Sequence, residues 1–417
     1  MIKNKIGKNV FEASKERIEY IFDNFEKIIV STSGGKDSNV MFNLVLKEAR
    51  KRNRKICMFV LDWECQFQQT MDHIQYLYES NKEYIDLHWV CLEIETNSSC
   101  SMHEPLWRSW DENKKALWTR EKPKFSNSDP KKYPFYYPGI TFEEFVPLFA
   151  QWYAEDKKCA CFVGIRSQES LNRFRAVARK DISRFNDKKY TVKLDNGVYN
   201  VYPIYDWLVE DIWTFFAKTG EPYNKIYDRM YQSGLTLNQM RIDEPFGEEA
   251  RKNLWLYQII EPITWSKFTA RMAGVNSACL YSQEKGNILG NDKVSLPKGH
   301  TWESFCNFLL DSMPPMAADH YKDKIAVYLK WYRDRGYPDG IPDEGYYRLE
   351  QLGKIPAWRQ IAKNLLKNDW YCQTLGFGVT KSSNYEKYKK LMAKRRKEWG
   401  IYSKLSSKNG KKESVQG

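Results

Sequence analysis

The sequence predicts an α/β fold, a parallel twisted sheet with helices on both faces, followed by a mostly helical C-terminal domain. Two observations predict the sheet: four short runs are almost entirely apolar, and helical patterns alternate with them. Such alternation is typical of parallel sheets whose two faces are both buried. A third observation predicts the helical domain, because Trp-rich helical patterns with Pro and Gly breaks dominate from about residue 248 onward.

The predicted elements follow one another in the order of a parallel α/β sheet. We expect strands at 27–32, 55–64, 87–94 and 160–166, and helices at 37–53, 66–80 and 141–156. Asp-Asn-Gly between two alternating runs indicates a hairpin at 190–205, and an amphipathic helix follows until Gly220. The insertion 101–139 is too long for a simple connection, and such insertions are usually functional or mobile.

Composition and length bound the class of protein. A chain of 417 residues can bury at least one sizeable core, and we expect three parts, at 1–247, 248–380 and 381–417. No apolar run approaches the roughly 18–20 residues of a membrane span, and the N-terminal stretch has no signal-peptide core, so a cytoplasmic protein is expected.

Nine cysteines, an odd number, are predicted to be reduced thiols in cores. Cys159 and Cys161 alternate along a predicted strand and would face one side of it. Cys100 and His103 have a Cys-x-x-His spacing. A structural metal site needs four nitrogen or sulfur ligands, and no second pair has a suitable spacing, so metal binding by these residues is not expected.

The net charge of +13 is concentrated at the C-terminal end. From Lys381 to Gly417 there are twelve Lys or Arg and three Glu, so this tail holds +9 of the total. Two interpretations stay open for the tail. It is either a solubilising end or a nucleic-acid contact that weakens steeply with salt.

The strongest local signal is the stretch KIIVSTSGGKDSNVMF, which starts at Lys27. Gly34 and Gly35 stand between a strand and a helix, where glycine permits backbone angles that let several N–H groups point at one anion. Lys36 adds a positive charge, and Asp37 is suited to cap the helix or to hold Mg²⁺. Hydroxyl donors to a phosphate are predicted at Ser31, Ser33 and Ser38.

The stretch is not a Walker A loop, because Lys36 is followed by Asp37 and not by Ser or Thr. An ordinary strand-to-helix turn with an Asp or Ser cap is the alternative to a phosphate site.

Three motifs in order carry a family resemblance. Ser-Gly-Gly-Lys-Asp-Ser resembles the pyrophosphate-binding loop of the adenine nucleotide alpha-hydrolase superfamily, which includes ATP pyrophosphatases and phosphoadenosine phosphosulfate (PAPS) reductases. GIRSQESLNRFR, from Gly164, is similar to the Gly-x-Arg-x-x-Glu-Ser-x-x-Arg element of the reductase-like branch. YPIYDWLVEDIWTFF is similar to its Pro-x-x-x-Trp-x-x-x-Asp-x-Trp segment.

The later segments RIDEPFG and IPAWRQIAKNLLKNDW resemble a long PAPS reductase-like family that includes immunoglobulin-binding regulator A. Members of that family are often encoded beside a ParB-like partner. The resemblance implies an adenine nucleotide as ligand, either ATP or PAPS, and a ParB-like protein as partner.

Arg166 is expected at the carboxyl end of the fourth strand, where open parallel sheets form ligand sites. Arg173 is seven residues further on, so the two guanidinium groups share a face only if the intervening turn is helical. Near the glycine turn they would clamp an oxyanion. Glu169 either orients both by ion pairing or is a solvated carboxylate. The predicted catalytic set is Lys36, Asp37, Arg166 and Arg173, with Gly164 and Glu169 in the nucleotide site.

Two residues at the end of the second predicted strand complete the predicted nucleotide site. Asp62 is expected to accept a hydrogen bond from the ribose or the adenine, unless it is a plain strand-ending Asp. Trp63 is expected to stack on the adenine, with a place in the core as the equal alternative.

Three functions stay open. The leading hypothesis is an enzyme that cleaves ATP between the α- and β-phosphates, holds the pyrophosphate at 33–38 and adenylylates an acceptor, with sulfur transfer to a nucleic acid as one continuation. The second is a nucleotide-sensing regulator that acts on DNA with a ParB-like partner. The third, a PAPS reductase, is disfavoured because Glu-Cys-Gly-x-His is missing, and Cys372 is expected to be a buried structural thiol.

Overall fold

A computed structural model describes residues 7–377, except 102–103, 105, 179–181, 248–249, 282–294 and 368, together with residues 394 and 398. The chain divides into two compact units. Unit 1 contains Met1–Glu95, Arg108–Pro245 and Leu256–Lys267, and unit 2 contains Thr96–Trp107, Phe246–Trp255 and Phe268–Gly417. The basic tail from residue 381 lies outside the described residues apart from Lys394 and Glu398.

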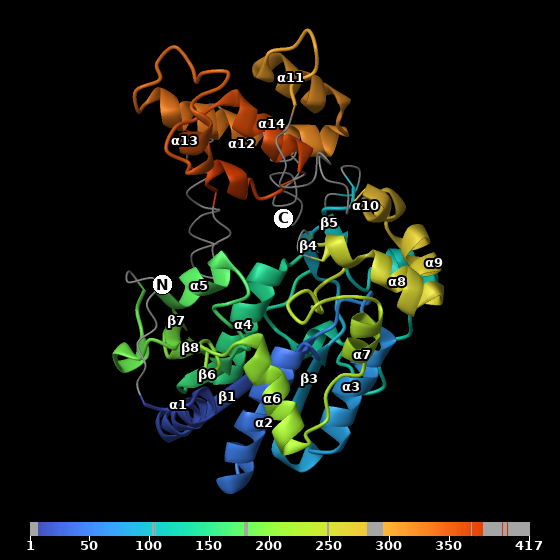
Figure 1. Cartoon of the computed structure of the whole chain (residues 1–417), viewed down its shortest axis with the longest axis vertical. Helices are drawn as coiled ribbons and strands as arrows, with labels where there is room; N and C mark the ends of the chain where they lie inside the picture. The colour runs from blue at the N-terminus through green and yellow to red at the C-terminus, as the bar shows by residue number, and fades with distance from the viewer. Residues whose placement is uncertain are drawn as a thin grey trace, which may run out of the picture. The chain divides into compact units, whose positions relative to one another are not determined.

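Unit 1 is built on a six-stranded sheet with the order β3-β2-β1-β6-β8-β7 (Figure 1). Its strands are β1 (Lys27–Ser31), β2 (Ile56–Leu61), β3 (Ile85–Val90), β6 (Cys159–Phe162), β7 (Thr191–Asp195) and β8 (Val198–Val201). Neighbouring strands run parallel except β7 and β8, which form the predicted hairpin. A separate short pair is formed by β4 (Glu95–Asn97) and β5 (Leu106–Arg108). The prediction of a mainly parallel sheet is confirmed.

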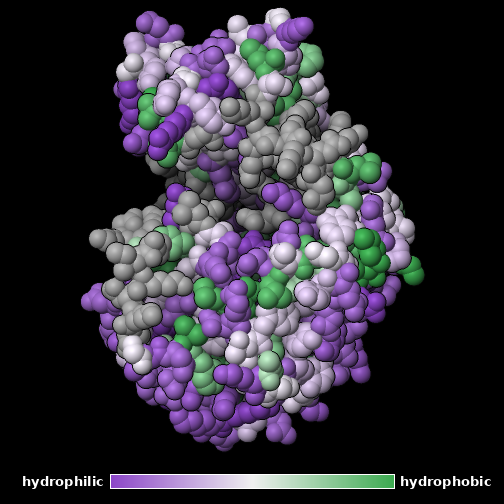
Figure 2. Space-filling view, in the orientation of Figure 1, coloured by the Kyte–Doolittle hydropathy of each residue, from purple (hydrophilic) through white to green (hydrophobic). Residues whose placement is uncertain are grey.

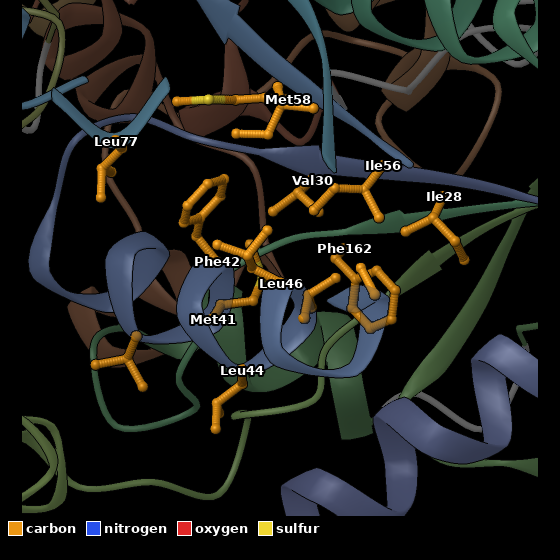
Figure 3. Close-up of a cluster of buried hydrophobic side chains, with 14 of the residues drawn as sticks. Ile28, Val30, Met41, Phe42, Leu44, Leu46, Ile56, Met58, Leu77 and Phe162 are labelled. Carbon is orange, nitrogen blue, oxygen red and sulfur yellow. The ribbon is translucent and has the colours of Figure 1, made fainter. Parts of the chain in front are cut away.

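Helices cover both faces of this sheet, because successive strand residues point to opposite sides. One face packs against α1 (Val10–Asn24), α2 (Lys36–Lys51), α3 (Gln68–Glu79) and α6 (Val209–Thr219). The other face packs against α4 (Phe142–Ala154). Figure 3 shows the first face, where Met41 and Phe42 of α2 lie near Val30 and Ile56 of the sheet. The alternation within β1 is complete, since Ile28 and Val30 join the first cluster and Ile29 joins the second.

Three helices, α2, α3 and α4, begin and end close to their predicted limits. The predicted end of α6 at Gly220 has a clear local cause. Gly220 has a φ of +68° and follows α6 as its cap, with its N–H bonded to the carbonyl of Phe216. A left-handed residue of this kind ends a helix at little cost when it is glycine. The shorter helices that follow the sheet strands are α5 (Leu171–Ala178) and α7 (Ile226–Gln232).

The remaining described chain is helical, and no strand follows Val201 within it. Its helices are α8 (Trp255–Ile260), α9 (Pro262–Arg271), α10 (Val275–Tyr281), α11 (Trp302–Ser312), α12 (Pro315–Arg333), α13 (Tyr347–Gln351) and α14 (Trp358–Leu366). The core of unit 2 is formed by α11, α12 and α14, with Cys306 and Tyr321 among its buried residues. This confirms the predicted helical C-terminal region.

All nine cysteines are buried thiols, as predicted. Cys159 and Cys161 face the α4 side of the sheet together with Cys57, while His103 lies outside the described residues. Burial raises the pKa of the Cys372 thiol to about 12. Hydrophilic residues cover most of the face seen in Figure 2. Where the chain is described, none of its helices has both the length and the apolar character needed to cross a membrane.

Candidate functional site

The glycine turn connects β1 to α2 at the carboxyl end of the sheet. Gly34 has a φ of +72°, and a Cβ atom there would lie 2.6 Å from Cγ2 of Thr70, so only glycine fits. Gly35 is the N-cap of α2 and provides no side-chain hydrogen bond to the first turn. The N–H groups at the start of α2 are therefore capped by other groups of the chain or by a ligand.

Lys36 is the first residue of α2 and is only 2% exposed. Its Nζ donates a hydrogen bond to the carbonyl of Met240 (2.8 Å) and lies 3.3 Å from Oδ2 of Asp37. Its backbone N–H donates to Oη of Tyr227 (2.9 Å). Nζ also lies 5.3 Å from the centroid of the Tyr227 ring, so Met240, Asp37 and Tyr227 surround the ammonium group.

The hydroxyl groups of the turn lie close together. Oγ of Ser33 and Oγ of Ser38 are 3.1 Å apart, and Ser38 also donates to the carbonyl of Gly35 at 3.0 Å. Ser33 is exposed, whereas Ser31 is the last residue of β1 and is half-buried. Ser33 is thus the predicted hydroxyl that solvent and a ligand reach most easily.

The second motif lies directly against the first. Gly164 follows β6, and a Cβ atom there would lie 3.0 Å from both Cα and N of Ser38, so the chain needs glycine to approach α2 this closely. Arg166 is 3% exposed, and its Nε donates to Oδ1 of Asp37. Its Nη1 donates to Oε1 of Gln168 at 3.0 Å. The structure therefore brings the predicted lysine, aspartate and arginine together.

Glu169 links the two predicted arginines. Its carboxylate accepts from the guanidinium group of Arg173 and lies 3.8 Å from Nη2 of Arg166. The two arginines meet through Glu169 and not on one helix face, because α5 begins only at Leu171. Of the two interpretations of Glu169, the structure shows the ion pair.

Asp62 and Trp63 have partners within the chain. The Asp62 carboxylate accepts from Nε1 of Trp89 (2.9 Å) and from the N–H of Glu64 (2.8 Å), and it pairs with Arg120 of the insertion. Trp63 is half-buried, with its ring centroid 5.7 Å from that of Phe142. A nucleotide contact by either residue stays a prediction.

Sequence reasoning missed the segment after α6, which supplies most of the remaining contacts. Asn224 donates from Nδ2 to the carbonyl of Gly34 and to Oγ1 of Thr70, both at 3.0 Å. Arg241 donates to the carbonyl of Glu169 at 2.6 Å. Tyr227 and Met240 contact Lys36. The only sequence signal was the RIDEPFG segment, which begins at Arg241.

Asp37, the predicted magnesium ligand, has cationic side chains as its neighbours. Both oxygens of Asp37 face cations, Lys36 and Arg166. Within the described residues, no three His, Cys, Asp or Glu side chains are grouped so that they could hold a metal ion. These residues do not form a magnesium site by themselves.

Comparison with known proteins agrees with the motifs. Residues 27–234 match the phosphoadenosine phosphosulfate reductase domain, and residues 234–341 match a domain of unknown function (DUF3440). Uncharacterized protein YbdN of Escherichia coli is 41% identical over 396 residues, which are 94% of this chain and 96% of the relative. Uncharacterized protein MJ0066 of Methanocaldococcus jannaschii is 26% identical over 219 residues, 52% of this chain and 37% of the relative.

Two solved structures are more distant. PAPS reductase from Candida auris, in a phosphate complex, is 14% identical with a TM-score of 0.28 and covers 54% of this chain and 93% of its own. Candida glabrata FMN adenylyltransferase with ATP is 17% identical with a TM-score of 0.30 and covers 52% and 57%. Similarity at this level does not bear on the site. The chain therefore contains a phosphoadenosine phosphosulfate reductase domain and belongs to the same family as YbdN.

Proposed function

We propose that the protein binds an adenine nucleotide at residues 33–38 and cleaves it between the α- and β-phosphates. The observation that carries this proposal is the contact between the two motifs: Gly164 lies against the backbone of Ser38, and Arg166 pairs with Asp37. A glycine turn, a helix N-terminus and a guanidinium group thus share one place, which suits a polyphosphate. The PAPS reductase domain match supports an adenine nucleotide as that ligand.

The proposed reaction needs positioning and electrostatic stabilisation more than a side-chain nucleophile. An acceptor oxygen, from water or a hydroxyl group, attacks the α-phosphorus and loses its proton to solvent, and the bond from that phosphorus to the bridging oxygen breaks. Pyrophosphate leaves with the electron pair of the broken bond. The developing charge is stabilised by the ammonium group of Lys36 and by Arg166 at the N-terminus of α2, with Arg173 held nearby through Glu169.

The nature of the ligand and the acceptor belongs to the same proposal. ATP with water as acceptor yields AMP and pyrophosphate, and another acceptor becomes adenylylated, which permits a later sulfur transfer to a nucleic acid. PAPS carries a sulfate in place of the β-phosphate, so it would occupy the same site without the release of pyrophosphate, and it needs an additional cation for its 3′-phosphate. The insertion 101–139 contains many basic residues that are suited to this role.

The test is calorimetric titration with ATP, PAPS and CTP, followed by chromatography of the same samples for AMP and pyrophosphate. We expect ATP to bind and AMP to appear. Lys36→Ala and Arg166→Ala should each weaken ATP binding about 10- to 100-fold, because each removes a charge-assisted hydrogen bond of roughly 1.5–3 kcal/mol. Lys47→Ala and Arg175→Ala, exposed cations of α2 and α5, are the matched controls and should leave the affinity unchanged.

A second candidate is a nucleotide-sensing regulator with a ParB-like partner and a nucleic-acid contact through the tail 381–417. The burial of all nine cysteines favours it over a PAPS reductase, since a sulfur-attacking thiolate must be accessible. Wild type that binds ATP but forms no AMP, even with the partner present, would contradict the enzyme and support the sensor. Binding of PAPS alone would redirect the proposal to phosphosulfate chemistry.

A further inference from the structure

Tyr227 of α7 lies at the centre of the candidate site although no predicted motif includes it. Its Oη accepts a hydrogen bond from the N–H of Lys36 at 2.9 Å. A Cβ atom on Gly35 would lie 3.4 Å from the same oxygen, which therefore stands directly over the glycine turn. The side chain is 2% exposed. Tyr227 is thus a buried polar group aimed at the first turn of a 16-residue helix.

The hydrogen of this hydroxyl group has no acceptor in the described part of the chain. A phenol oxygen accepts with its lone pairs and donates with its one hydrogen. The accepting side is used by Lys36, and no hydrogen bond donated by Tyr227 is formed to any described residue. A buried donor without an acceptor is costly, so such a group usually has a ligand or a water as its partner.

The surroundings keep the hydroxyl group protonated. Burial, together with the carboxylates of Asp37, Asp243 and Glu169, raises the pKa of Tyr227 well above its ordinary value. The hydroxyl group is therefore protonated, and a donor, at neutral pH. A donor beside Lys36 and the helix N-terminus is suited to an anionic oxygen and not to a cation.

We propose that Tyr227 is a further ligand-binding residue: its Oη, oriented by the N–H of Lys36, donates a hydrogen bond to an oxygen of the bound pyrophosphate group. This inference rests on the proposed function and adds to it a residue from outside the three motifs. Asn224, three residues before Tyr227, supports the arrangement because its side chain donates a hydrogen bond to the carbonyl of Gly34. The segment 224–227 therefore contacts the glycine turn through both Asn224 and Tyr227.

The experiment is calorimetric titration of wild type, Tyr227→Phe and Tyr223→Phe with inorganic pyrophosphate and with ATP. Tyr223→Phe is the matched control, since it removes a hydroxyl group that donates to Asp228 (2.8 Å) from the same segment. We expect Tyr227→Phe to bind both probes about tenfold more weakly, as for one hydrogen bond to a charged group, and Tyr223→Phe to bind within twofold of wild type.

The outcomes separate this inference from the proposed function. Equal binding by wild type and Tyr227→Phe overturns the inference alone. Tighter binding by Tyr227→Phe overturns it too, because the hydroxyl group would then occupy the position of a ligand oxygen. Wild type that binds neither probe nor PAPS overturns the proposed function and the inference with it.

A second measurement covers the case in which Tyr227→Phe does not fold. With 3-fluorotyrosine placed at position 227, the fluorine resonance should shift at saturating pyrophosphate, and the same label at position 223 should not respond. An unchanged resonance at position 227 under saturation overturns the inference.

Discussion

Two buried carboxylate–arginine pairs follow neighbouring strands of the sheet, and their surroundings differ. Asp37 and Arg166 form the loop pair, and Asp62 and Arg120 form the insertion pair. The carboxylate of the insertion pair is saturated by Trp89, Glu64 and Arg120, all within the chain. The loop pair lies at a helix N-terminus beside Lys36. The same residue types thus form an intrachain ion pair after β2 and part of a candidate anion site after β1. The two places differ in that the glycine turn lies beside the second one.

Breaking the insertion pair should give the largest loss of stability. Arg120→Ala leaves the carboxylate of Asp62 buried without its cation, which should lower the free energy of unfolding by about 3–5 kcal/mol. Urea denaturation measures this, with Arg175→Ala as an exposed control that should change it by less than about 0.5 kcal/mol. The affinity of the folded variant for ATP should stay unchanged. A tenfold loss of that affinity would place the insertion pair in the binding site.

The glycine turn itself gives the next largest effect. Gly34→Ala meets both a positive φ and a contact of 2.6 Å with Thr70, whereas Gly220→Ala meets only a positive φ in open space. We expect losses of about 2–4 kcal/mol for Gly34→Ala and about 1–2 kcal/mol for Gly220→Ala. Only Gly34→Ala should also weaken ATP binding. Equal effects of the two variants on stability and affinity would show that the turn tolerates a side chain.

The polar network behind the loop pair should also respond to pH. Burial lowers the pKa of His73 from 6.5 to about 4, and its Nε2 accepts from Nδ2 of Asn39 at 3.0 Å. As the pH falls below 6.5, His73 is protonated in the unfolded chain before it is protonated in the folded protein. The free energy of unfolding therefore decreases, by roughly 2 kcal/mol at pH 5. His73→Gln should lack this part of the pH dependence in urea titrations between pH 8 and 5. An identical slope in wild type and variant would contradict the assignment.

The sheet and the glycine turn were readable from the sequence because their signals are local. The apolar runs that became β1, β2, β3 and β6 and the Ser-Gly-Gly-Lys-Asp-Ser turn each occupy one short stretch. The contacts that Tyr227 and Met240 make with Lys36 were not readable, because the sequence separations are 191 and 204 positions. A backbone carbonyl such as that of Met240 has no residue-type signature. The partners of Asp62, Trp89 and Arg120, were not readable either, because they lie 27 and 58 positions away in the chain.

The carbonyl of Met240 has a consequence for how this protein can be divided. The PAPS reductase domain match ends at residue 234, where the DUF3440 match begins, yet Met240 and Arg241 contact Lys36 and Glu169. A fragment cut at residue 234 would keep every motif of the loop but leave the buried ammonium group of Lys36 without its shortest hydrogen bond. The two family segments are therefore not interchangeable modules. Chimaeras of relatives should join their parents after residue 241 or later.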